Sequence, residues 1–112
     1  MNKTEYKPTM KELKRVYYLK KEIQSLQKTL QKVEAEAILL NIAIKTTELQ
    51  MQYDKIFTWI FSIDDPLIRL IIKARYLDCY TWNEVADEVG GNNTEYSVKK
   101  IAYRYFEKEA IK

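Results

Sequence analysis

The placement of glycine and proline constrains this chain more than any other feature of its sequence. Gly90 and Gly91 are the only glycines among 112 residues, and Pro8 and Pro66 are the only prolines. Because these two residue types mark most turns and breaks, their scarcity favours long helices. Hydrophobic residues make up 46% of the chain and nine residues are tyrosine, which argues against disorder. We therefore expect an all-α fold.

Apolar residues in the first half of the chain follow a heptad pattern. The steps between them alternate between three and four residues, which is typical of the buried seam of a coiled coil. The positions between them are mostly Lys, Gln and Glu, as a solvent-exposed face requires. The predicted seam consists of Val16, Leu19, Ile23, Leu26, Leu30, Val33, Ala37, Leu40 and Ile44.

This pattern predicts one long coiled-coil helix in an N-terminal arm, residues 1–62. No glycine or proline separates Thr9 from Ile63, so we expect a nearly continuous helix from about Thr9 to the region of Phe61. At 1.5 Å per residue it would be ~75 Å long. A helix of that length cannot bury its seam against the rest of the chain, so we expect a homodimer formed through the seam. A hairpin broken near Asn41 is the alternative.

Residues 63–112 carry the start signals of three short helices. Asp65 before Pro66 is typical of a helix N-terminus, since Asp caps well and proline fits the first turn. Thr81 and Glu84 have the spacing of a capping box. Asn93 or Thr94 caps the last helix.

The two glycines then fit the turn of a helix-turn-helix. Such a motif needs a small residue in its first helix and a glycine four residues later, and Ala86 and Gly90 have that spacing. Val98 and Ile101 supply the apolar positions that lock the second helix. The turn is two residues longer than in the tight form of the motif. We therefore predict a three-helix head that contains a helix-turn-helix.

The stretches "IDDPLIRLIIKARYLD", "YTWNEVADEVGG" and "NTEYSVKKIAYRYFEK" resemble small phage and prophage proteins of low-GC Gram-positive bacteria. The C-terminal part of those proteins is similar to the DNA-binding region 4 of sigma factors. The resemblance covers about the last fifty residues. It implies a DNA-binding phage transcription regulator of the RinA/ArpU type.

A helix-turn-helix protein of this kind places its last helix in the major groove of double-stranded DNA. We expect the N-terminal turns of that helix to lie nearest the bases, with basic side chains on guanines or phosphates. The candidate DNA-binding residues are Asn93, Thr94, Tyr96, Lys99, Lys100, Tyr103 and Arg104. Candidates for flanking backbone phosphates are Arg69, Lys73 and Arg75.

Charge permits this function without requiring it, because the net charge is only +3. The first 32 residues have a balance of +6, which we interpret as a solvated helix face. Residues 61–112 carry eight basic and nine acidic side chains. That balance favours the alternative hypothesis, a phage module or inhibitor that binds a host protein. Host RNA polymerase or a defence nuclease such as a CRISPR effector would be its target.

The sequence offers little for catalysis. Without histidine it lacks the commonest general base and zinc ligand, and nothing in it suggests a glycine-rich phosphate loop. We therefore expect no enzyme activity, no metal and no cofactor. Cys79 is the single cysteine, which fits a reducing compartment. No apolar run approaches the roughly 18 residues of a membrane span. We expect a cytoplasmic protein in a bacterial host cell, with no membrane partner.

Overall fold

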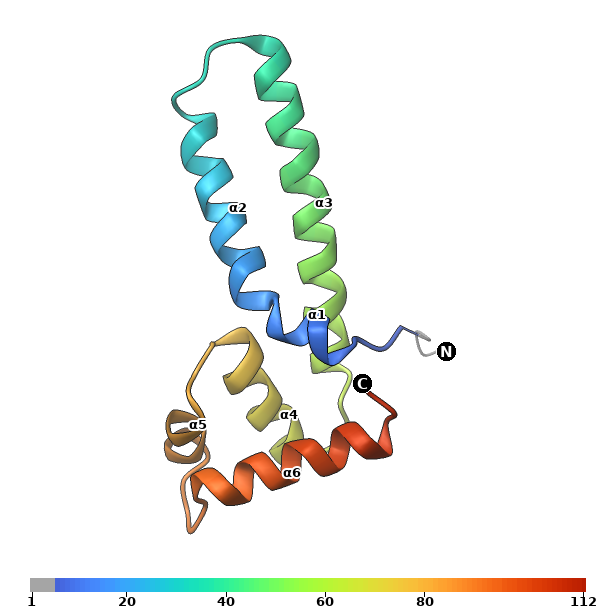
Figure 1. Ribbon diagram of the computed structural model, residues 1–112. Coiled ribbons are helices and arrows are strands. Elements are labelled where there is room, and N and C mark those ends of the chain that lie inside the picture. The colour runs from blue at the N-terminus through green and yellow to red at the C-terminus, as the bar shows by residue number, and fades with distance from the viewer. Residues whose placement is uncertain (1–5) are drawn as a thin grey trace.

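The computed structural model describes residues 6–112, and the regular elements within this range are helices, without a strand. The all-α prediction is confirmed. Residues 1–5 of the predicted arm lie outside the described range. The elements are α1 (Met10–Lys14), α2 (Val16–Leu30), α3 (Glu36–Phe61), α4 (Pro66–Ile72), the π-helical turn η1 (Lys73–Leu77), α5 (Trp82–Val89) and α6 (Glu95–Lys108). In Figure 1, α2 and α3 stand side by side above a base formed by α4, α5 and α6. Below, "arm" means α1 to α3 and "head" means α4 to α6.

The prediction of one continuous helix in the arm is wrong. The chain leaves helical structure between Gln31 and Ala35, and α2 and α3 form an antiparallel hairpin (Figure 1). The alternative, a hairpin, is confirmed, but its predicted break near Asn41 is wrong, because Asn41 lies inside α3. Neither helix end at this turn has a side-chain cap, and the turn contains no glycine or proline. The usual local signals are therefore missing here.

Packing explains why the hairpin forms. Val16, Leu19 and Ile23 of α2 are buried, and they belong to the same apolar cluster as Leu49 and Ile56 of α3. The chain thus supplies its own partner for the first part of the predicted seam, and no second copy is needed to cover it.

The later part of the predicted seam is largely exposed to solvent. Leu30, Leu40 and Ile44 are 40%, 61% and 52% exposed, and Ala37 is exposed as well. The nine seam residues therefore do not form one surface. The seam fails because the turn reverses the chain direction, while the face of α3 that meets α2 runs through Leu49 and Ile56.

Arm and head share one hydrophobic core. Leu13 and Val16 of the arm and Ile71 and Val98 of the head are all at most 1% exposed and lie in one cluster. Polar contacts also join the two parts. The backbone N–H of Met10 donates to the carbonyl of Lys112 at 2.8 Å.

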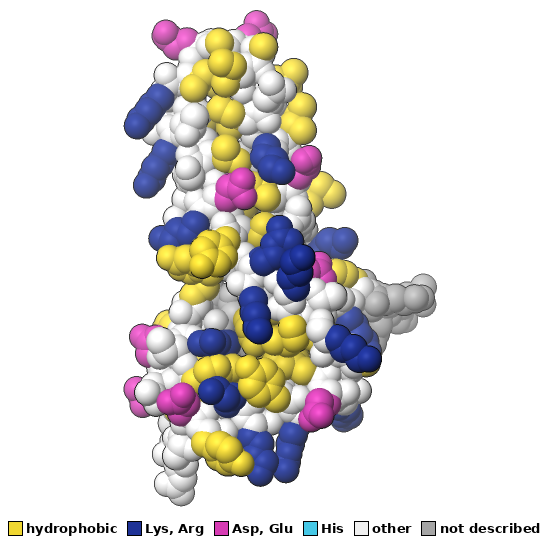
Figure 2. Space-filling view, viewed as in Figure 1, with side chains coloured by type: hydrophobic (Ala, Val, Ile, Leu, Met, Phe, Trp, Pro, Cys, Tyr) yellow, Lys and Arg dark blue, Asp and Glu magenta, His cyan; other side chains and the backbone are white. Residues whose placement is uncertain are grey.

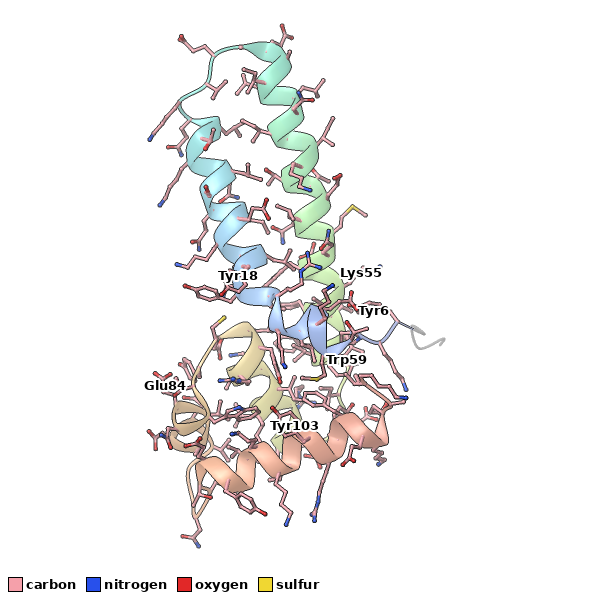
Figure 3. All side chains as sticks on the ribbon, in the orientation of Figure 1. Tyr6, Tyr18, Lys55, Trp59, Glu84 and Tyr103 are labelled. Atoms are coloured by element: carbon pink, nitrogen blue, oxygen red, sulfur yellow. The ribbon has the colours of Figure 1, made fainter. Side chains whose placement is uncertain are left out.

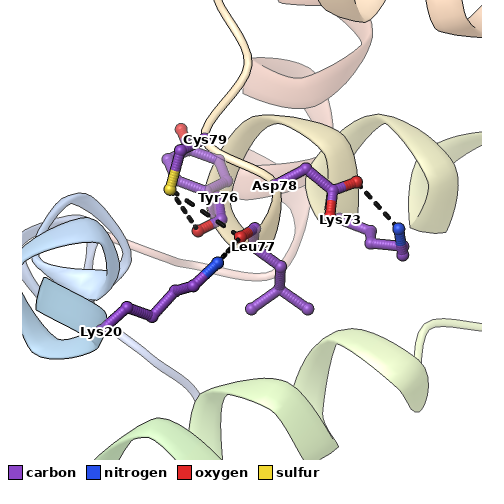
Figure 4. A network of polar contacts seen from close by, with 6 residues as sticks. All are labelled: Lys20, Lys73, Tyr76, Leu77, Asp78 and Cys79. Atoms are coloured by element: carbon purple, nitrogen blue, oxygen red, sulfur yellow. Dashed lines mark hydrogen bonds and ion pairs between the residues drawn. The ribbon is translucent and has the colours of Figure 1, made fainter. Parts of the chain in front are cut away.

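The turn η1 is where α2 meets the head. The Lys20 ammonium of α2 donates to the carbonyl of Leu77 at 2.8 Å (Figure 4). The backbone N–H of Asp78 bonds the carbonyl of Lys73, five residues back, which is the bond of a π turn. Cys79 follows with φ +62° and is half-buried near the helix end. The widened turn therefore lies directly under the base of the arm.

The predicted start signals of the head helices are confirmed. The Asp65 carboxylate accepts from the N–H groups of Leu67 and Ile68, and Thr81 and Glu84 form a capping box. α5 ends at Gly90, which has φ +75° and ψ −159°, and Gly91 has φ +64°. Both glycines occupy backbone conformations that residues with a Cβ atom rarely adopt. This turn fixes the direction in which α6 leaves α5.

Candidate nucleic-acid interface

The outer face of α6 collects five of the predicted DNA-binding residues. Val98, Ala102 and Phe106 are buried and fix the inner face of the helix. With 3.6 residues per turn, the remaining positions point away from the core. This face has one shallow hollow of about 350 Å³. It is lined by Tyr96, Lys99, Lys100, Tyr103 and Arg104, together with Glu107. The structure therefore brings these five side chains together.

The basic side chains on this face are only weakly engaged within the chain. The Lys100 ammonium lies 5.6 Å from the centroid of the Tyr96 ring, and Tyr96 is 71% exposed. Lys99 lies 3.9 Å from the Glu95 carboxylate one turn earlier, at the limit of an exposed ion pair. Such a pair contributes at most about 1 kcal/mol. An anionic ligand would therefore displace little when it binds here.

Arg104 lies at the edge of two hollows. One is the hollow on the outer face of α6, and the other is a groove of about 410 Å³ beside Asp64 and Asp65. Within residues 6–112, Arg104 has no ion pair. Its guanidinium therefore remains accessible on the same helix as Lys99 and Lys100.

Asn93 and Thr94 have a structural role that the sequence partly indicated. The Thr94 hydroxyl accepts from the Ser97 N–H at 3.1 Å, and the Ser97 hydroxyl accepts from the Thr94 N–H at 2.8 Å. The Asn93 amide donates to the carbonyl of Gly90 at 3.1 Å and accepts from the Ser97 hydroxyl at 3.2 Å. These bonds cap α6 and hold the turn. Contact with DNA through either side chain stays a prediction.

The three predicted phosphate contacts of the head all have partners in the chain. Arg69 donates to the carbonyl of Ile63 at 2.6 Å, so it ties the α3–α4 connection. Lys73 pairs with the Asp78 carboxylate at 2.8 Å, and that hydrogen bond raises the pKa of Lys73 (Figure 4). Arg75 donates to the carbonyl of Tyr80 at 2.9 Å. Arg69 and Lys73 therefore serve local structure, and neither lines the hollow on α6.

Arg75 differs from the other two because it contacts a row of aromatic rings that leads to α6. Its guanidinium carbon lies 4.7 Å from the centroid of the Trp82 ring. The Trp82 ring lies 5.9 Å from the ring of Tyr103, which is 42% exposed on the outer face of α6 (Figure 3). Beside this row, burial raises the pKa of Tyr76 to about 12, so its phenol is neutral near pH 7.

Sequence reasoning did not find this row. Arg75, Trp82 and Tyr103 come from η1, α5 and α6, and no spacing along the chain brings three such segments together. Trp82 is 7% exposed and belongs to the hydrophobic core. Its second role as a bridge between Arg75 and Tyr103 depends on the crossing of the helices.

No helix in the described range is both long and apolar enough to cross a membrane.

Comparisons with models of protein families, with curated proteins and with solved structures find no match for this chain.

Proposed function

We propose that this protein is a phage-encoded, DNA-binding transcription regulator whose α5–turn–α6 unit acts as a helix-turn-helix. The observation that carries the proposal is the outer face of α6. That face presents three basic and two aromatic side chains on one exposed surface, with a single acidic neighbour in the same hollow. The resemblance of residues 63–106 to sigma region-4-like phage proteins supports it.

The proposed mechanism follows from the position of α6. The helix has 14 residues, so it is ~21 Å long and fits along the major groove. Tyr96 and Lys99 in its first turns would lie nearest the base edges. Lys100, Tyr103 and Arg104 would reach bases or phosphates further along. A good bidentate contact, such as Arg104 to guanine, would contribute about 1–3 kcal/mol of discrimination.

Fluorescence anisotropy with DNA duplexes tests this proposal. The variant Lys99→Ala, Lys100→Ala, Arg104→Ala removes the three basic groups of the α6 face. The variant Lys28→Ala, Lys32→Ala, Lys112→Ala removes the same charge at exposed positions away from that face. We expect salt-sensitive binding by the wild type, retained by the control and abolished in the α6 variant. The slope of log affinity against log salt should fall by about 0.9 for each phosphate that the variant no longer neutralises.

Failure of the wild type to bind any duplex at low salt would overturn the regulator proposal. The near-neutral charge of residues 61–112 would then direct the search to a protein partner, such as host RNA polymerase or a defence nuclease. Binding by the α6 variant equal to that of the control would show that α6 is not the reading helix.

We also propose that two copies pair through the outer face of α3. Leu40, Ile44 and Met51 are 61%, 52% and 62% exposed, and they lie on the side of α3 opposite the buried Leu49 and Ile56. In Figure 2, hydrophobic side chains line the right-hand edge of the arm, over α3. A helix that is apolar on two opposite faces is typical of one that contacts two neighbours. This surface takes over the dimer role predicted for the continuous seam.

Charge on this face favours an antiparallel partner. Glu48 and Lys55 precede and follow Met51 by three and four residues, so they lie on the same side of the apolar stripe, and both are exposed. In an antiparallel pair, Glu48 of one arm faces Lys55 of the other, and the contact occurs twice by symmetry. In a parallel pair, the two-fold axis places this flank of each arm at opposite edges of the interface, so the Glu48–Lys55 contact does not form.

Sedimentation of charge-swap variants tests this pairing. We expect Glu48→Lys or Lys55→Glu to weaken the dimer, and the double variant to restore it. Leu40→Ser with Ile44→Ser should give a monomer. A wild type that is monomeric at high micromolar concentration would overturn the proposal, and a double variant without rescue would exclude the antiparallel arrangement.

A further inference from the structure

A second basic and aromatic surface lies where the arm meets the head. One cleft of about 280 Å³ lies between them. From the arm it is lined by Lys14, Tyr17 and Tyr18, and from the head by Arg75 and Tyr80. Tyr17 and Tyr18 are 45% and 69% exposed, with their rings edge to face at 5.2 Å. The floor of the cleft is apolar and includes Leu13.

The charged residues that line this cleft, Lys14 and Arg75, are both basic. No Asp or Glu lines it within the described part of the chain. Lys21 adds a further ammonium, 5.5 Å from the centroid of the Tyr17 ring, and Lys14 is exposed. Asp78, which directly follows η1, pairs with Lys73 on the side away from Cys79 and Tyr76 (Figure 4). The cleft therefore combines cations with phenol hydroxyl donors, and these groups suit phosphate oxygens.

Arg75 connects the cleft to the outer face of α6 through the buried Trp82 ring. Arg75 belongs to the cleft, and its guanidinium stacks on Trp82, which in turn contacts Tyr103. These contacts, at 4.7 Å and 5.9 Å, place the Arg75 guanidinium and the Tyr103 ring closer together than the ~12 Å width of the major groove. Figure 2 shows Lys and Arg side chains on one face of the molecule from the base of the arm to the head, with acidic side chains mostly toward its edges.

From this arrangement we infer that the cleft binds the phosphate backbone of the same DNA duplex that α6 reads. The inference rests on the proposed function and extends it to a second contact site. With α6 in the groove, one backbone strand beside the groove lies against Arg75 and the cleft. Lys14 and Lys21 neutralise its phosphates, and Tyr17 and Tyr18 donate hydrogen bonds. Lys14 and Lys21, part of the basic balance of the first 32 residues that we interpreted from the sequence as a solvated face, then have a function.

Duplex length separates this second contact from the first. Binding is measured by anisotropy on duplexes of about 12 and about 24 base pairs, because only the longer one reaches beyond the groove that holds α6. The test variant is Lys14→Ala with Lys21→Ala. Its matched control is Lys28→Ala with Lys32→Ala, which removes the same charge from the far end of the arm. Arg75 is left intact because its bonds to Tyr80 and Trp82 also stabilise the head.

We expect the affinity of the test variant to fall about tenfold for the long duplex and less than twofold for the short one. Its salt slope on the long duplex should fall by about 1.8, while the control behaves as the wild type. If the test variant binds the long duplex as tightly as the wild type does, the inference is overturned and the proposed function stays intact. An equal decrease in both variants also overturns it, because the effect then follows net charge. Absence of wild-type binding on both duplexes overturns inference and proposed function together.

Discussion

Replacing Gly90 with alanine tests the account of the turn before α6. Gly90 has φ +75° and ψ −159°, a region that is essentially restricted to glycine. An ideal Cβ atom built at this position meets no heavy atom within 4 Å. The cost of a side chain is therefore backbone strain, of order 1–3 kcal/mol, without a steric clash. Alanine also reduces the conformational entropy of the unfolded chain, which offsets about 0.4–1 kcal/mol.

We therefore expect Gly90→Ala to lower the free energy of unfolding by about 1–2 kcal/mol, with Tm lower by about 4 °C per kcal/mol. Urea denaturation followed by circular dichroism measures the change. The matched control is D-alanine at the same position, introduced by joining a synthetic segment at Cys79. A D-residue adopts positive φ without strain, so this variant should be as stable as the wild type or slightly more stable. Equal destabilisation by both enantiomers would refute the reasoning, because the cost would then be steric.

Three further predictions concern the core, the tyrosines and the cap of α6. Ile60 is 0% exposed within the shared core, so Ile60→Ala should cost about 2–5 kcal/mol in urea denaturation, and a decrease below about 1 kcal/mol would contradict that packing. Burial raises the pKa of Tyr76 from 10.0 to about 12. The stability that its neutral phenol contributes should therefore be fully present below pH 10 and be lost as pH rises from 10 toward 12. Tyr76→Phe should flatten that decline in Tm, and an unchanged profile would count against it. Thr94→Ala should lower the free energy of unfolding by about 0.5–2 kcal/mol because it removes the cap, whereas Thr29→Ala, at an exposed position of α2, should change it by no more than about 0.5 kcal/mol.

Features that depend on neighbours three or four residues apart could be predicted from the sequence. Asp65 caps α4 and the Thr81–Glu84 box opens α5, since each bond joins groups that any helix start brings together. The turn at Gly90 follows for the same reason. The outer face of α6 was predictable because helical periodicity assigns each residue to one side once Val98 and Ala102 are placed in the core.

The arm could not be predicted from periodicity, because the heptad spacing continues through a turn that lacks glycine, proline and a cap. One signal was present in the sequence. Leu49 and Ile56 lie off the predicted seam, and a second apolar face on α3 requires a second neighbour. Burying that face against Val16 and Leu19 favours the hairpin, and the stabilisation comes from residues that are far apart in the sequence.

The sequence by itself determined that the chain is helical, where the head helices begin, and which side of α6 faces outward. Only the tertiary structure decided that α2 folds back on α3, and that Arg75 reaches Tyr103 through Trp82. The physical reason is range. Caps, turns and helix faces depend on hydrogen bonds and sterics within one or two helical turns. The arm and the basic cleft depend on which distant apolar surfaces bury one another, and that choice is made by the free energy of the whole core.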